Sequence, residues 1–85
     1  MGFFLSILLY ITTNMNFVEG KVIDSKMGDD LVMVQVSSSV ETTYTDINGN
    51  YRISYAEGDS LTFKYVGYNT IKVCVEDCGN VSLSY

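Results

Sequence analysis

Four oxygen-bearing side chains have the spacing of a calcium-binding loop. Positions 1, 3, 5 and 12 of an EF-hand-like pattern are filled by Asp46, Asn48, Asn50 and Glu57. The sixth position of such a loop turns sharply and is normally glycine, whereas here it is Tyr51. The alternation from Tyr51 to Tyr55 predicts a strand, which would carry Glu57 away from Asp46. We therefore expect a hairpin turn in which Asp46 accepts nearby backbone N–H groups, and no metal ligands.

The only two cysteines, Cys74 and Cys78, are the second group whose chemistry is worth testing. A tetrahedral zinc site needs four ligands, and the chain has no histidine to complete one. The C-x3-C spacing also differs from the C-x-x-C of redox motifs. In an exported protein a disulfide could form between them and would close a short hairpin. The sequence leaves this disulfide and two reduced thiols as open alternatives.

Composition removes most other chemistry. Without histidine the chain lacks the commonest general base and the commonest metal ligand. No Ser/His/Asp set, paired-acid site or phosphate-binding loop is apparent, so we expect no enzyme and no cofactor. The formal net charge of −5, from ten acids and five bases, argues against nucleic-acid partners and against electrostatic docking on anionic lipid.

The first part of the chain differs sharply in composition from the rest. Residues 1–18 contain no charged side chain, and the run from Phe3 to Ile11 is almost wholly apolar. Such a run fits the apolar region of a signal peptide and is shorter than a membrane span of about 20 residues. No Lys or Arg precedes it and no small-x-small cleavage site follows it. We divide the chain into an apolar signal-like or anchor segment, residues 1–16, with membrane association through residues 3–11, and a domain, residues 17–85. A true start at Met15, or a segment that packs on a partner, are the alternatives.

The elements of that domain follow a two-residue period. Alternating side chains between turn residues predict seven strands, at 17–23, 31–37, 41–45, 51–55, 61–65, 71–76 and 81–85. Such a pattern is typical of an all-β, seven-stranded antiparallel Greek-key sandwich. The turn at Asn48-Gly49 predicts a hairpin between the third and fourth strands, with Gly49 at positive φ. The same parity places Phe63 in the core.

Six tyrosines could form a stacking platform for sugars or peptides, namely Tyr44, Tyr51, Tyr55, Tyr65, Tyr68 and Tyr85. Four of them, Tyr51, Tyr55, Tyr65 and Tyr85, share the inward parity of their strands. We therefore expect these four in the core, with their hydroxyl groups at its rim.

Three stretches of the predicted domain resemble a known family. They are Val18-Glu19-Gly20-Lys21-Val22-Ile23-Asp24, Thr45-Asp46-Ile47-Asn48-Gly49-Asn50-Tyr51-Arg52-Ile53 and Leu61-Thr62-Phe63-Lys64-Tyr65-Val66-Gly67-Tyr68. Over about residues 17–85 the chain resembles the carboxypeptidase regulatory-like domain, an immunoglobulin- or prealbumin (transthyretin)-like sandwich. The form it resembles is the Bacteroidetes one found at the N-terminus of TonB-dependent outer-membrane receptors. Where the family usually has a Pro-Leu-Pro-Gly stretch, this chain has Asp30-Leu31-Val32-Met33.

The resemblance implies a non-catalytic binding or scaffold module with a protein partner. Receptors of this kind continue into a plug and a barrel, whereas the resemblance covers only the sandwich. The resemblance therefore implies the fold and not the receptor role. Together with the apolar segment, it leads us to expect a protein of the periplasm or cell envelope. The alternative is a structural or decoration protein of a larger assembly, such as a phage virion. Exposed loops and strand edges of a sandwich suit either role.

Overall fold

The computed structural model describes residues 16–77 and 79–85. The strands are β1 (Asn16–Asp24), β2 (Gln35–Ser37), β3 (Thr42–Tyr44), β4 (Asn50–Tyr55), β5 (Ser60–Lys64), β6 (Ile71–Cys74) and β7 (Asn80–Leu83), with one 3-10 turn, η1 (Val75–Asp77), before β7. Of the predicted apolar segment, residues 1–16, only Asn16 lies among the described residues. In the described part of the chain, no helix has the length and apolar character needed to cross a membrane.

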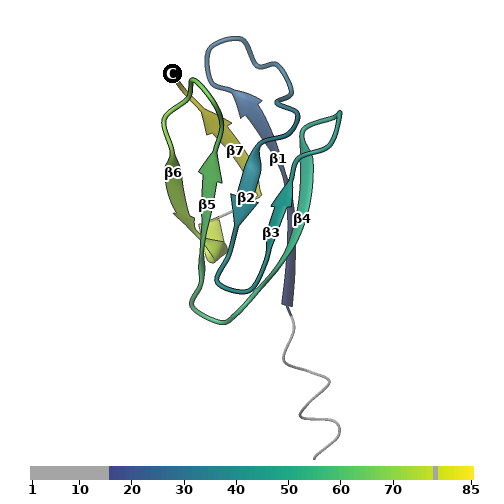
Figure 1. Ribbon diagram of the computed structural model, residues 1–85, viewed down its shortest axis with the longest axis vertical. Coiled ribbons are helices and arrows are strands. Elements are labelled where there is room, and N and C mark those ends of the chain that lie inside the picture. Colours follow the sequence, from purple (N-terminus) through teal and green to yellow (C-terminus); the bar gives the residue numbers. More distant parts are fainter. Residues whose placement is uncertain (1–15, 78) are drawn as a thin grey trace, which may run out of the picture.

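The strands form two sheets that face one another, in the orders β4-β1-β7 and β3-β2-β5-β6 (Figure 1). The predicted all-β sandwich of seven strands is confirmed. One pair departs from the antiparallel prediction, because β7 runs parallel to β1. The chain reaches β7 from the other sheet through η1, and it therefore enters beside β1 in the same direction.

The core fills the space between the sheets with alternate side chains of both. The largest fully buried side chains include Phe63, Ile53 and Leu61, which confirms the inward parity of β4 and β5. The ring of Phe63 meets that of Tyr51 edge to face across the two sheets, with centroids 5.4 Å apart. Such aromatic pairs add to the stabilisation that their buried area gives.

The predicted second strand, residues 31–37, is only partly a strand. Leu31 and Val34 are buried, but Val32 and Met33 between them are exposed, and Met33 has a φ of 65°. The buried side chain of Thr45 holds this turn. Its hydroxyl group donates to the carbonyl of Leu31 at 2.6 Å and accepts the N–H of Val34 at 2.9 Å. These bonds replace ladder bonds, so β2 begins only at Gln35.

The Asn48-Gly49 turn is present but does not close a hairpin. β3 pairs with β2 and β4 pairs with β1, so the turn passes from one sheet to the other. Gly49 has a φ of 77°, as expected. Oδ1 of Asp46 accepts the N–H groups of Asn48 and Asn50, each at 2.9 Å. The side chain of Asp46 therefore stabilises the turn itself, as in an Asx turn.

The prediction that Tyr85 faces the core is wrong. β7 ends at Leu83, and the carbonyl of Ser84 accepts the N–H of Asn69 at 2.8 Å. Tyr85 is 60% exposed and contacts Tyr68 edge to face at a centroid distance of 5.1 Å. Of the other three tyrosines expected inward, Tyr51 is buried and Tyr55 and Tyr65 are half-buried.

Replacing Phe63 tests the core. Phe63 is completely buried, so Phe63→Ala should lower the free energy of unfolding by about 3–5 kcal/mol, because lost burial and a cavity add. Denaturant unfolding of the variant measures this. A loss below about 1 kcal/mol would mean that the ring is not packed between the sheets.

Replacing Gly49 tests the turn between the sheets. A Cβ atom at Gly49 would lie 2.8 Å from the carbonyl oxygen of Val22, and the φ of 77° disfavours side chains. We expect Gly49→Val to lower the free energy of unfolding by more than about 1 kcal/mol. Gly58 is the matched control, because its φ is 81° but nothing lies within 4 Å of its Cβ position. If Gly58→Val lowers the free energy of unfolding by as much as Gly49→Val, backbone strain alone explains the loss at Gly49.

Candidate partner-binding groove

The connections between the strands gather at the two ends of the sandwich (Figure 1). The loops β1–β2, β3–β4 and β5–β6 lie at one end, together with the C-terminus. The turns β2–β3 and β4–β5, the segment η1 and the beginning of β1 lie at the other. The second end has an opening between the sheets, and the first has a hollow bordered by tyrosines.

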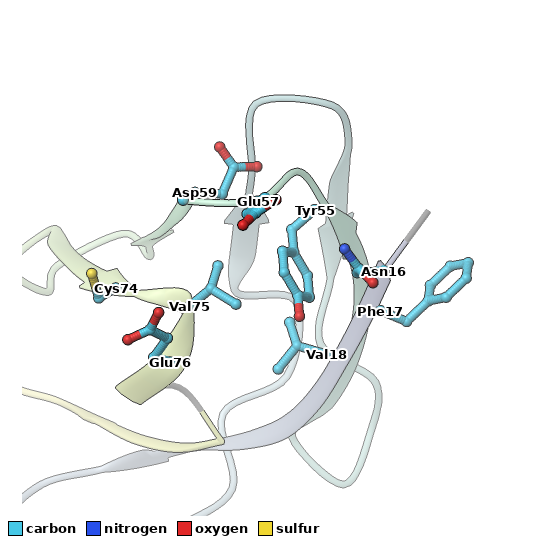
Figure 2. A pocket seen from close by; sticks show the side chains of 10 residues that line it. Asn16, Phe17, Val18, Tyr55, Glu57, Asp59, Cys74, Val75 and Glu76 are labelled. Atoms are coloured by element: carbon cyan, nitrogen blue, oxygen red, sulfur yellow. The ribbon is translucent and has the colours of Figure 1, made fainter. Parts of the chain in front are cut away.

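The opening is a groove of about 290 Å³, called the end groove below. Its lining residues are Asn16, Phe17, Val18, Tyr55, Glu57, Gly58, Asp59, Cys74, Val75 and Glu76. In Figure 2, Val18 and Tyr55 of one sheet point into the space that faces Val75, whereas Phe17 points away from it. Val18 and Val75 also pack against the core. The floor of the groove is thus an extension of the core that the sheets leave open.

One side of the groove is formed by a strand edge. β4 pairs with β1 from Asn16 to Lys21, but β7 pairs only from Lys21 onward. The N–H of Lys21 donates to the carbonyl of Gly79 on the β7 side, at 2.9 Å, and peptide groups alternate in direction along a strand. The N–H and C=O groups of Phe17 and Glu19 therefore point to the β7 side. No strand of the described residues pairs with them there.

The outer edge of β4, on the opposite side of the same sheet, is protected at Ser54. Oε1 of Glu41 accepts both the N–H and the hydroxyl group of Ser54 in β4, at 2.7 and 2.8 Å. The hydroxyl group of Ser38 donates to the carbonyl of Ser54 at 2.8 Å. The bonds from Ser54, helped by the charge of Arg52, lower the pKa of Glu41. Side chains of the β2–β3 turn thus occupy the N–H and C=O groups of Ser54, which could otherwise pair with another chain.

The charged side chains that line the end groove are all acidic: Glu57, Asp59 and Glu76. Oδ2 of Asp59 accepts the N–H of Ala56 at 2.9 Å and the hydroxyl group of Ser39 at 2.8 Å. These bonds lower the pKa of Asp59 and keep its carboxylate ionised. Glu57 and Glu76 are exposed at the rim. The groove is therefore apolar at its floor and negatively charged at its mouth.

The hollow at the opposite end is larger, about 490 Å³, and aromatic. Its lining residues are Met33, Gln35, Tyr44, Lys64, Tyr65, Val66, Tyr68 and Thr70. The rings of Tyr65 and Tyr68 lie 5.4 Å apart, and Tyr44 is half exposed. Part of the predicted tyrosine set is thus brought together here, although it is a shallow surface on the outside of the sandwich.

The structure separates the four side chains that have the spacing of a calcium-binding loop. Asp46, Asn48 and Asn50 lie in or beside the β3–β4 turn, whereas Glu57 lies in the β4–β5 turn at the other end of the sandwich. Among the described residues, no three His, Cys, Asp or Glu side chains are grouped closely enough to hold a metal ion.

Of the predicted cysteine pair, only one member can be placed. Cys74 is exposed at the end of β6, as its outward parity predicted, and it lines the end groove. Cys78 lies outside the described residues, so the disulfide and two reduced thiols both stay open as alternatives.

Sequence reasoning did not find the end groove. Val18 and Tyr55 were predicted as strand residues, and Glu57 only as a loop residue. No sequence signal indicated it, because the predicted strands at 17–23 and 81–85 are similar in length, whereas β1 has nine residues and β7 has four. Half of a long strand beside a short neighbour has no partner on that side.

Calcium binding at the β3–β4 turn provides a direct test of the Asx-turn interpretation. Because Asp46 is occupied by two backbone N–H groups, we expect the melting temperature to be the same with calcium and with a chelator. A bound ion at a hundredfold excess over its Kd would raise stability by about 2.7 kcal/mol. A calcium-dependent rise that Asp46→Ala abolishes would show that the turn is a metal site.

Comparison with known proteins identifies the family of the sandwich. A model of the CarboxypepD_reg-like domain matches residues 18–84, from the third residue of β1 to just beyond β7. Neither the curated proteins nor the solved structures contain a significant match to the chain. The family match spans all seven strands except for the first two residues of β1, Asn16 and Phe17, which also line the end groove. The chain therefore belongs to the carboxypeptidase regulatory-like domain family.

Proposed function

We propose that this chain is a protein-binding or scaffold module of the bacterial cell envelope, and that it binds its partner at the end groove. The observation that supports it is the groove itself, an apolar hollow beside a strand edge whose backbone groups no strand of the described residues pairs with. The family's sandwich is a non-catalytic module, and the chain has no histidine to act as a base. Such a surface suits binding better than catalysis.

The position of the groove in the chain supports an envelope location. Asn16 lines the groove, and only residues 12–15 separate it from the apolar run that ends at Ile11. Four residues span at most about 14 Å. If residues 3–11 associate with a membrane, the groove lies close to the membrane surface. Its acidic rim would be repelled by anionic lipid, which favours a protein at that surface as the partner.

Site-specific photo-cross-linking in the native cells tests the binding surface. We would place p-benzoylphenylalanine at Phe17, beside the groove, and at Tyr44 as the control. The two aromatic residues are exposed to similar extents, 54% and 50%, at opposite ends of the sandwich. We expect adducts with one partner from Phe17 and none from Tyr44, recovered in the envelope fraction.

Two results would contradict the proposal. Adducts from Tyr44 but not from Phe17 would move the partner to the aromatic hollow. Adducts that join copies of this chain within a large soluble particle would replace the envelope role with the alternative, a structural protein of an assembly such as a virion.

A further inference from the structure

We propose that the end groove accepts an extended, basic segment of its partner, which pairs with the exposed edge of β1 as an added strand. This inference rests on the proposed function and names the chemistry of the partner. Three features support it: the backbone groups of the edge, which no described strand pairs with, the apolar floor, and the sign of the charge at the rim.

The edge offers a strand-pairing template. Phe17 and Glu19 each direct one N–H and one C=O to the β7 side of β1, in the half of the strand that β7 does not reach. On the outer edge of β4, the polar groups of Ser54 are bonded to Glu41 and Ser38. Among the described residues, no equivalent side chain bonds to the first half of β1. Extended peptides add to sheet edges of this kind through main-chain bonds.

The floor of the groove would receive alternate side chains of such a segment. Successive side chains of a strand point to opposite faces. Those that point toward the core would meet Val18, Tyr55 and Val75, which line a hollow of about 290 Å³. Apolar side chains at these alternate positions would extend the existing core. The added strand would occupy the place that a longer β7 would fill.

The rim determines the charge of the segment. Glu57, Asp59 and Glu76 line the groove, and neither Lys nor Arg does. A segment with Lys or Arg beside its apolar residues would complement these carboxylates. A second copy of this chain is disfavoured as the occupant, because a two-fold contact would bring the same acidic rims together.

Synthetic peptides test both parts of this inference. The probe is a short labelled peptide of alternating Val and Lys, added to the full chain. Two controls replace Lys by Glu, or N-methylate alternate backbone amides so that they cannot donate. By fluorescence anisotropy, we expect each control to bind at least about tenfold more weakly than the probe. Hydrogen exchange should slow at the amides of Phe17 and Glu19.

Charge reversal of the rim locates the site. Glu76→Lys should weaken binding of the probe by about tenfold at low salt, with a smaller effect at high salt. Asp29→Lys is the matched control, because it makes the same charge change on an exposed loop at the other end of the sandwich. We expect it to leave the affinity nearly unchanged. Thermal melts of both variants show whether the fold is retained.

Several outcomes would overturn the inference. Equal binding of the Lys and Glu peptides would remove the basic partner, and equal binding of the N-methylated peptide would remove strand addition. Failure of all three peptides to bind, or an equal loss in both charge variants, would reject the site. The cross-linking result at Phe17 is independent of these outcomes. A partner captured there in the absence of peptide binding would leave the proposed function intact and reject only the added basic strand.

Discussion

The carbonyl group of Gly79 is the point on which the arrangement of the sheets depends. It accepts the N–H of Lys21 at 2.9 Å and the hydroxyl group of Tyr51 at 3.0 Å. Tyr51 in turn packs edge to face on Phe63 of the other sheet. The core aromatic pair thus fixes where the chain joins β1. The close approach of Gly79 to β1 requires glycine at position 20, where a Cβ atom would overlap the Gly79 carbonyl.

This junction also explains why the sandwich is open at one end. Because the chain joins β1 only at Lys21, the first half of that strand lacks a second neighbour among the described residues. Shortly before Gly79 the chain forms η1. This turn follows β6, at the edge of the other sheet, and does not pair with β1. The groove is therefore a consequence of how the connection between β6 and β7 is built, and its apolar floor is the part of the core that this connection does not cover.

Acidic side chains serve two roles around this end of the sandwich. Glu41 and Asp59 each accept hydrogen bonds from backbone and side-chain donors, and these bonds lower the pKa of both. They close turns and protect the edge of β4. Glu57 and Glu76 stand exposed at the groove. This end of the sandwich thus combines a β4 edge that is closed at Ser54 with an acidic groove beside β1.

The sequence by itself determined the sandwich, the inward parity of Phe63 and the positive φ of Gly49, because alternation and turn chemistry are local properties. The sequence pattern placed the turn at Asn48-Gly49 but assigned it wrongly to a hairpin, since strand pairing depends on contacts distant in sequence. The buried Thr45 hydroxyl delayed the start of β2 to Gln35 for the same reason. Only the tertiary structure decided the end groove. Its edge exists because strands of unequal length meet, and no local pattern records which side of a strand remains unpaired.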